Sequence, residues 1–564
     1  SESWAMWLHG GLTLWLLLGL IALPAIAQQP PTQELPPPTP LQTVVPPQAP
    51  ADALASEGAD VTRFRMRVEA ALNEPRAAKG HWGLLVVDGE TGATVFEWGA
   101  DQYFTPASNT KLYTTALAMA TLGPDYRFRT TIETNGAVDA QGRLIGDLVL
   151  VGRGDPNLSP RKLPYDREVE TDGAAEKILA QLADQVVARG VSQIEGDVVA
   201  DDSFFPYERY PSGWAIDDML WRYGAPVSAL AVNDSVVTIE LRPALKVGAP
   251  VWMGVEPWAN FYELRGAVMT GTAGSARQLR VQREPGSHVI DINGTLPLGY
   301  PPEKINIAIE EPAEHAAALL RRLLEARGVR IYGTTRAQHR SLPPPGMLAP
   351  MMTEVAAAPG GGAVDGAVEP AAVLAEHFSL PLIESVTVIN KVSQNLHTEM
   401  LLRTASRETT GDGGTEAALQ MAEEFQESIG IAEGDVRLHD GSGLSRRNLV
   451  TPRATATLLR WAAAQPWGEA FRASLPVAGL DGTLEDRMKD TSAAGRVWAK
   501  TGTLDNVNSL AGYAETLSGR RLIFAIYGNL HNLRGRRPAS VIDAVCVAMV
   551  EEIGRSENLT SLPQ

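Results

Sequence analysis

Cysteine and metal-binding patterns are nearly absent from this chain of 564 residues. The single cysteine, Cys546, lies in a helical pattern near the C-terminus, which excludes an internal disulfide and predicts a buried, unreactive thiol. The nine histidines show neither a His-x-x-x-His nor a paired-carboxylate spacing. We therefore expect no metal site and no other cofactor.

Basic residues are also fewer than acidic ones in this chain. The chain has 49 Lys and Arg residues against 66 Asp and Glu residues, a formal net charge of −17, and no dense basic cluster. Because a phosphate backbone is bound by a basic field, this balance argues against nucleic acid as a partner. A Gly-x-Ser-x-Gly nucleophile elbow is missing as well, which argues against an ordinary α/β-hydrolase.

The apolar run near the N-terminus, LTLWLLLGLIALPAIA, is short and ends on the small-x-small pattern Ala25-Ile26-Ala27. This pattern is typical of a secretory signal peptide and predicts export to a periplasm or cell-wall compartment. The first basic residue is Arg63, so the usual positive region is missing. We interpret residues 1–27 as a signal peptide or, alternatively, as an uncleaved anchor, the only segment for which we expect membrane contact.

Composition divides the rest of the chain. Residues 28–60 are rich in Pro, Gln and Ala and predict a disordered linker, and residues 354–370 form a flexible low-complexity connector. Residues 126–353 change to short strand-like runs with two helices, which predicts a mixed α/β insert of one or more domains. Residues 555–564 form a tail.

The segments on either side of the insert complement each other. Residues 61–125 predict a helix, two strands and a second helix, whereas residues 371–554 predict helices, an antiparallel hairpin and a final helix. Together they predict one catalytic domain, an antiparallel sheet with helices, assembled from both ends of the chain. The expected fold class is therefore α+β and multi-domain.

The segment FTPASNTKLYTTALAMATLG contains Ser108 and Lys111 three residues apart at the start of an apolar helix. This spacing puts both side chains on one helix face, where a neutral lysine can remove the proton of the serine hydroxyl. Alone, Ser108 is as well explained as a capping residue and Lys111 as a solvated side chain. Ser159 and Lys162 share the spacing, but the neighbouring prolines break any helix there.

Two further motifs favour the interpretation of Ser108 and Lys111 as a nucleophile and its base. KVSQN contains Ser393 and Asn395 in a Ser-x-Asn pattern within a helix-rich segment. VWAKTGTLDNVNSLAGY contains Lys500-Thr501-Gly502 on the apolar strand that precedes the final hairpin. The ordered set Ser-x-x-Lys, Ser-x-Asn and Lys-Thr-Gly is associated with penicillin-binding proteins and serine β-lactamases.

The chain resembles the low-molecular-mass penicillin-binding proteins of the class C type, which are D-alanyl-D-alanine carboxypeptidases and endopeptidases with a large insert between the first two motifs. The 285 residues from Ser108 to Ser393 exceed the spacing of a β-lactamase. The resemblance covers roughly residues 65–553 and includes GDLVLVGRGDPNLS, YGAPVSALAVND and HDGSGLSRRNLVTP. It implies a transpeptidase-like domain and hydrolysis of peptidoglycan stem peptides, with β-lactam antibiotics as inhibitors.

The resemblance also implies a role for each motif residue. Ser108 would attack the carbonyl between two D-alanines, Lys111 would accept its proton, and Ser393 would relay a proton to the leaving amine. Asn395 would hydrogen-bond the substrate or Lys111. The substrate-binding residues would be Lys500, Thr501, Gly502 and Thr503, with the backbone N–H groups of residues 108 and 503 forming an oxyanion hole.

Two alternatives stay open. A non-catalytic scaffold that binds the cell wall would keep this fold, although it would need neither Lys111 nor Ser393. A β-lactamase would use the same motifs, but the long insert and the absence of an evident deacylating glutamate argue against it. The three intact motifs favour the peptidase.

Overall fold

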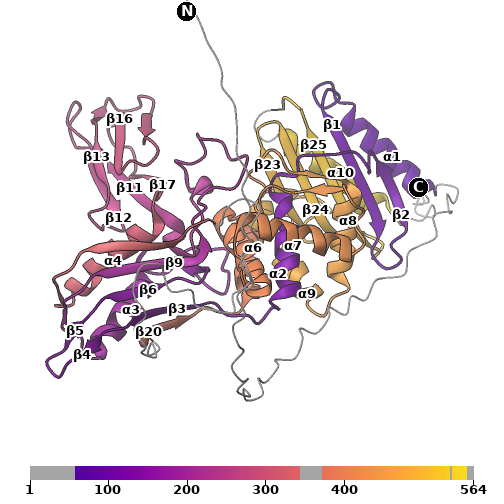
Figure 1. Ribbon diagram of the computed structural model, residues 1–564. Helices are drawn as coiled ribbons and strands as arrows, with labels where there is room; N and C mark the ends of the chain where they lie inside the picture. Colours follow the sequence, from indigo (N-terminus) through magenta and orange to yellow (C-terminus); the bar gives the residue numbers. More distant parts are fainter. Residues whose placement is uncertain (1–57, 343–370, 534–536, 555–564) are drawn as a thin grey trace, which may run out of the picture. The chain divides into compact units, whose positions relative to one another are not determined.

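The computed structural model describes residues 58–342, 371–533 and 537–554 (Figure 1). The predicted signal peptide or anchor, most of the linker, the connector at 354–370 and the tail at 555–564 lie outside the described residues. Within the described ranges, none of the helices combines the length and apolarity that crossing a membrane requires.

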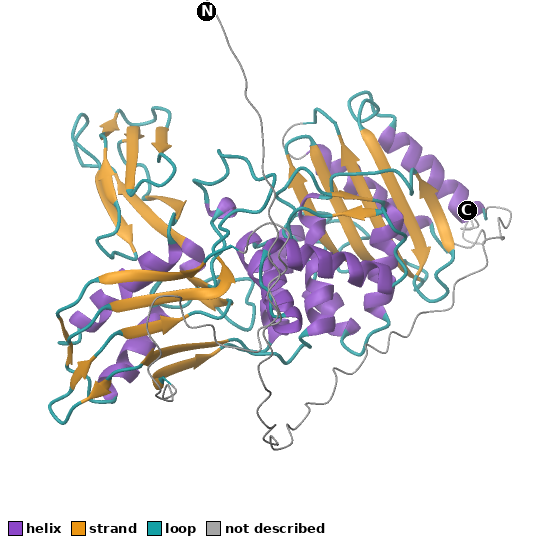
Figure 2. Cartoon of the chain, in the orientation of Figure 1, coloured by secondary structure: helices purple, strands orange, loops and turns teal. Residues whose placement is uncertain are grey.

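A five-stranded antiparallel sheet joins segments from the two ends of the chain (Figures 1 and 2). Its strand order is β2-β1-β25-β24-β23, and β1 pairs with β25 from His81 opposite Asn529 to Asp88 opposite Leu522. The predicted hairpin is formed by β24 and β25. The strands are β1 (His81–Asp88), β2 (Thr94–Trp98), β23 (Val497–Leu504), β24 (Val507–Glu515) and β25 (Arg521–Asn529).

Alternating side chains give this sheet two apolar faces. On β1, Trp82, Leu84 and Val86 belong to one buried cluster, whereas Leu85 and Val87 belong to another. The first cluster includes side chains of α1 (Ala59–Leu72) and α10 (Arg537–Glu552). The second includes side chains of α2 (Thr110–Thr121), α6 (Asn395–Thr410), α7 (Thr415–Ser428), α8 (Pro452–Ala463) and α9 (Gly468–Ser474).

The helical pattern around Ser393 is interrupted at that residue. The helix α5 (Leu382–Val392) ends there, because Ser393 adopts a left-handed conformation with φ 60° and ψ 44°. The side chain of Gln394 then accepts a hydrogen bond from the N–H of Leu396 and caps α6. The Ser-x-Asn motif therefore lies at the junction of two helices and not inside one.

The insert is built on a second five-stranded sheet of mixed direction, ordered β19-β9-β6-β3-β20. Its last strand, β20, follows the connector, so residues 372–378 pair with the insert although the sequence assigns them to the other domain. The strands are β3 (Arg129–Thr134), β6 (Leu148–Val151), β9 (Val198–Pro206), β19 (Thr335–Arg340) and β20 (Ala372–Phe378). The two predicted helices are α3 (Lys177–Ala188) and α4 (Pro312–Glu325).

Smaller sheets complete the insert. One has the order β12-β11-β17 and another groups β13, β14 and β15 around β16, and the two share an apolar cluster. These strands are β11 (Val236–Arg242), β12 (Trp252–Glu256), β13 (Glu263–Arg265), β14 (Val268–Gly271), β15 (Gln278–Gln282), β16 (Val289–Pro297) and β17 (Glu303–Ala308). Antiparallel and mixed sheets with flanking helices confirm the expected α+β fold class.

Candidate active site

Ser108 and Lys111 lie one turn apart, as their spacing predicts. Ser108 is in a 3-10 turn (Ala107–Asn109) that leads directly into α2, and Lys111 is in the first turn of that helix. The Lys111 Nζ lies 2.9 Å from the Ser108 Oγ. Lys111 is completely buried, whereas Ser108 is partly exposed and accessible to a ligand.

The surroundings of the Lys111 amine favour its neutral form. The Nζ donates hydrogen bonds to the Asn395 Oδ1 at 2.6 Å and to the backbone carbonyl of Ser442 at 2.5 Å. Both partners can only accept, and the Asn395 amide is oriented by its Nδ2, which donates to the Tyr223 carbonyl at 2.8 Å. A neutral amine has two N–H groups for these acceptors, so its lone pair is left for the hydroxyl of Ser108.

The pKa of Lys111 is lowered to about 7, chiefly because burial disfavours the ammonium form. The nearby carboxylates of Asp440 and Glu399 oppose this effect and hold the pKa above the value that burial alone would give. Glu399 is itself buried, and burial beside Asp440 raises its pKa to about 7. Lys111 can therefore exchange a proton near neutral pH, as a general base must.

Glu399 and the loop after Asp440 form the support for Lys111. The Glu399 Oε1 accepts hydrogen bonds from the N–H groups of Gly441 at 3.0 Å and Ser442 at 2.7 Å. Asp440 accepts from the N–H of Gly443 at 2.9 Å and closes the turn. Glu399 thus holds the peptides on the N-terminal side of Ser442, and Asp440 holds the N–H of the 442–443 peptide, whose carbonyl accepts the hydrogen bond from Lys111.

Lys500 and Ser393 form a second amine–hydroxyl pair. The Lys500 Nζ donates to the Ser393 Oγ at 2.9 Å and to the Thr501 carbonyl at 2.9 Å. Burial, and then the charge of Lys111, lower the pKa of Lys500 well below its usual range. Because repulsion between two cations is mutual, protonation of either lysine disfavours protonation of the other.

Gly502 lets β23 approach the nucleophile closely. A Cβ at this position would lie 2.7 Å from the Pro106 carbonyl oxygen and 3.0 Å from the backbone nitrogen of Ser108. Even alanine therefore does not fit here. Thr501 hydrogen-bonds Thr483 through the two hydroxyls at 2.7 Å. Thr503 follows on the exposed part of the strand.

The insert contributes directly to the site. Asp234, in a left-handed conformation, is buried and accepts hydrogen bonds from the Gln394 Nε2 at 3.1 Å and from the Arg161 Nη2 at 2.5 Å, and its Oδ1 lies 2.9 Å from the His397 Nε2. The Trp214 Nε1 also donates to the Asp440 Oδ2 at 2.9 Å. Residues of the insert therefore hold both the Ser-x-Asn junction and the Asp440 turn.

The structure brings the predicted site residues together through these contacts. Lys111 bonds Ser108 and Asn395, Lys500 bonds Ser393, and Gly502 packs against the Ser108 turn. Sequence reasoning missed Glu399, although it lies one helical turn after Asn395 and so faces the same side of α6. The part played by the Asp440 turn was also beyond sequence reasoning, because a backbone carbonyl acceptor such as that of Ser442 has no sequence signature.

Known proteins with similar sequences are D-Ala-D-Ala carboxypeptidases. The D-Ala-D-Ala carboxypeptidase 3 (S13) family matches residues 64–352 and 358–548. A D-alanyl-D-alanine carboxypeptidase of Actinomadura sp. (strain R39) is 35% identical over 517 residues, which cover 90% of this chain and 88% of that protein. The D-alanyl-D-alanine carboxypeptidase DacB of Haemophilus influenzae is 25% identical over 448 residues, 77% of this chain and 82% of that protein.

A solved structure shows the same fold. The crystal structure of penicillin binding protein 4 (dacB) from Haemophilus influenzae matches with a TM-score of 0.70 at 22% identity, over 86% of this chain and 98% of that one. This likeness concerns the fold, whereas the sequence matches above identify the relatives. The chain therefore belongs to the D-Ala-D-Ala carboxypeptidase 3 (S13) family, and it is a serine peptidase with the fold of a low-molecular-mass penicillin-binding protein.

Proposed function

We propose that this enzyme hydrolyses the terminal D-Ala-D-Ala bond of peptidoglycan stem peptides and cuts peptide cross-links through an acyl-enzyme on Ser108. The observation that supports this most directly is the buried amine of Lys111. Its two acceptor partners leave the lone pair facing the Ser108 hydroxyl at 2.9 Å. A nucleophile and its base are thus in hydrogen-bonding reach before substrate arrives.

Acylation begins at Ser108. Its Oγ attacks the carbonyl carbon of the penultimate D-alanine while its proton passes to the neutral Lys111. The backbone N–H groups of residues 108 and 503 donate to the oxyanion that forms on the carbonyl oxygen. The close approach of Gly502 to the nitrogen of residue 108 supports this pairing.

Departure of D-alanine requires a proton on its nitrogen. Ser393 is suited to deliver it, because its hydroxyl is hydrogen-bonded to Lys500. Its motif partner, Asn395, is hydrogen-bonded to Lys111. The C–N bond breaks as the amine takes this proton, and an ester of Ser108 remains. Ser393 is reprotonated with the proton that Lys111 received from Ser108, so both residues return to their neutral forms. Water then attacks the ester with Lys111 as the base, which releases the shortened peptide and restores the serine.

Lys500 and Thr501 are proposed to bind the C-terminal carboxylate of the substrate. A carboxylate beside Lys500 would favour its charged form, and this positive charge would in turn favour neutral Lys111. β23 is the last strand of its sheet, and beyond the bridge between Val477 and Trp498 its outer edge is a surface on which an extended peptide can pair as an additional strand. Gly502 keeps that edge close to the nucleophile.

β-Lactams are proposed inhibitors, because a strained cyclic amide would acylate the same serine. The Haemophilus influenzae penicillin binding protein 4 has been solved in complex with a β-lactam, in a structure similar to this chain with a TM-score of 0.66. Since peptidoglycan lies outside the cytoplasm, we also propose that the enzyme is exported and acts in the periplasm or cell-wall compartment. Residues 1–27 would direct this export or anchor the protein.

Labelling with a fluorescent penicillin tests the proposal. We expect Ser108→Ala to abolish labelling and Lys111→Ala to slow it by about 100-fold or more, as the loss of a general base does. The chain provides matched controls in Ser159→Ala and Lys162→Ala, which have the same spacing but lie outside the site and should label like the native protein. Labelling that survives in Ser108→Ala contradicts the assignment of the nucleophile.

Product analysis separates the two peptidase activities from the alternatives. Incubation with a soluble pentapeptide that ends in D-Ala-D-Ala should release D-alanine, and incubation with cross-linked dimers should release monomers. A native protein that neither labels nor cleaves would be a scaffold. One that turns over penicillin rapidly would be a β-lactamase.

A further inference from the structure

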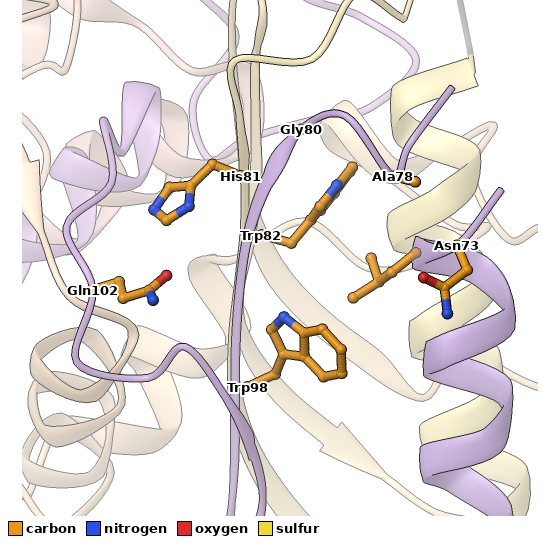
Figure 3. A pocket seen from close by; sticks show the side chains of 8 residues that line it. Asn73, Ala78, Gly80, His81, Trp82, Trp98 and Gln102 are labelled. Atoms are coloured by element: carbon orange, nitrogen blue, oxygen red, sulfur yellow. The ribbon is translucent and has the colours of Figure 1, made fainter. Parts of the chain in front are cut away.

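The two edge strands of the five-stranded sheet, β2 and β23, border different features. Beside β2, a small cavity at the end of α1 is lined by Trp82 and Trp98 among other residues (Figure 3). None of the proposed site residues borders this cavity. Beside β23, a loop of residues 476–484 reaches Thr501, one of the proposed substrate-binding residues.

The 476–484 loop occupies part of the outer edge of β23. At its start, the Pro476 carbonyl accepts a hydrogen bond from the N–H of Ala499 at 2.9 Å. Because the backbone groups of alternate residues face the same edge of a strand, those of Thr501 and Thr503 also face outward. The N–H of Thr503 is the proposed oxyanion donor. The open part of the edge therefore runs from this N–H toward Thr501 and is closed by the loop two residues further on.

The end of α5 holds the loop in place. The Lys391 Nζ donates to the Asp481 Oδ2 at 2.6 Å, and the Asp481 Oδ1 accepts from the N–H of Val477 at 2.8 Å. Gly482 has φ +57°, which glycine adopts readily, and a Cβ there would lie 2.8 Å from the Lys391 carbonyl oxygen. The loop is therefore packed against the last turn of α5, directly before Ser393.

This packing places the side chain of Thr483 beside that of Thr501. Thr483 follows Gly482 and is exposed, whereas Thr501 is mostly buried. The two hydroxyl oxygens lie 2.7 Å apart, so one hydroxyl donates a hydrogen bond to the other. A residue of a separate loop thus contacts the polar group that is proposed to bind the substrate carboxylate.

A bound carboxylate would fix the direction of this hydrogen bond. Each hydroxyl has one proton to donate, whereas a carboxylate can only accept. When Thr501 donates its proton to the carboxylate, the hydrogen bond between the two hydroxyls must be donated by Thr483. Each hydrogen bond polarises the next, so Thr483 makes Thr501 a stronger donor. This gain is largest for a charged acceptor and smaller for a neutral ester or amide.

We propose that Thr483 is a positioning residue, which orients the Thr501 hydroxyl toward the terminal carboxylate of the substrate. This inference rests on the proposed function, under which that carboxylate binds beside Lys500 and Thr501. Preference for a carboxylate over a neutral end group would then depend on the 476–484 loop as well as on the Lys-Thr-Gly strand.

Acylation by a penicillin and by its neutral methyl ester tests the role of Thr483. The second-order rate constant of acylation is measured for each compound, and the ratio of the two constants reports recognition of the carboxylate. We expect Thr483→Val to lower this ratio about fivefold, as the loss of one hydrogen bond does, and Thr483→Ser to keep the native ratio. Thr409→Val changes an exposed threonine of α6 and is the matched control, which should also keep the native ratio.

A double-mutant cycle separates action through Thr501 from any other effect. A positioning residue has no effect once the group that it orients is gone, so Thr483→Val should lower the ratio in the native protein but not in Thr501→Val. An unchanged ratio in Thr483→Val overturns the inference, and so does a loss that adds in full to that of Thr501→Val.

The outcomes also separate this inference from the proposed function. Penicillin labelling of the native protein and its loss in Ser108→Ala report the peptidase independently. A native protein that labels, but prefers the carboxylate no more than Thr483→Val does, keeps its proposed function and loses this inference.

Discussion

Acylation of Ser108 should depend on pH through Lys111, whose pKa burial lowers to about 7. A lysine accepts a proton only when it is neutral, so the competent fraction is about half at pH 7 and falls roughly tenfold with each pH unit below. A lysine in water, with a pKa of about 10.4, would be neutral in roughly one molecule of 2,500 at pH 7. We therefore expect the acylation rate constant to rise through about pH 7 and to level off above about pH 8.

The acid limb of the pH–rate profile, where the acylation rate constant rises with pH, should move when a carboxylate near Lys111 loses its charge. In Glu399→Gln the amide oxygen can still accept the N–H groups of the 441–442 turn, whereas the charge that favours protonated Lys111 is gone. Removal of that charge lowers the pKa of Lys111, so the limb should shift to lower pH. Since Glu399 is itself partly protonated near its pKa of about 7, we expect a shift of roughly half to one pH unit.

Stopped-flow acylation with a chromogenic β-lactam between about pH 5 and pH 9 measures this shift. Glu423→Gln, an exposed glutamate of α7, is the control and should leave the limb in place. A rate that stays flat from about pH 5 to pH 8 refutes the role of Lys111 as the base. A limb that moves to higher pH in Glu399→Gln refutes the electrostatic argument, and a merely structural effect of that variant would lower the plateau without moving the limb.

Gly502→Ala puts a methyl group within 2.7 Å of the Pro106 carbonyl oxygen, so we expect penicillin labelling to fall about 100-fold or more, measured by gel fluorescence. Gly443→Ala should lower the free energy of unfolding by about 1–3 kcal/mol in urea titrations, because φ is +85° and the new Cβ would lie 1.8 Å from the Ala107 carbonyl oxygen. Asp234→Asn should lower it by about 3–5 kcal/mol at neutral pH, since the buried Arg161 guanidinium loses its buried counter-charge. The pKa of Asp234 lies well below its ordinary value, so its contribution is present above about pH 4 and is lost as the pH falls further, and the native protein and the variant should then converge.

Local sequence patterns predicted much of the fold and the centre of the site. The spacing of Ser108 and Lys111 sets their geometry within one helical turn, so three residues of sequence suffice to predict the contact. Alternating apolar residues likewise predicted the hairpin of β24 and β25. In both cases the interacting groups are neighbours in the chain.

Contacts between distant segments were beyond such patterns. The left-handed turn at Ser393 depends on Gln394, which is held by Asp234 of the insert, and a helical pattern continues on both sides of it. The electrostatic setting of Lys111 depends on Glu399 and Asp440, which come from a helix and a loop far along the chain. Their effect on the pKa of Lys111 arises only when folding places both carboxylates around its amine.

The pairing of β1 with β25 has a consequence for how the polypeptide matures. The two strands are more than four hundred residues apart, so bringing them together costs about 5 kcal/mol of chain entropy before any contact compensates. A ribosome must release nearly the entire polypeptide before the sheet that backs the nucleophile can close. A nascent or proteolytically shortened chain that ends before residue 521 would therefore leave β1 paired with β2 alone, and the enzyme would stay inert until its last strand docks.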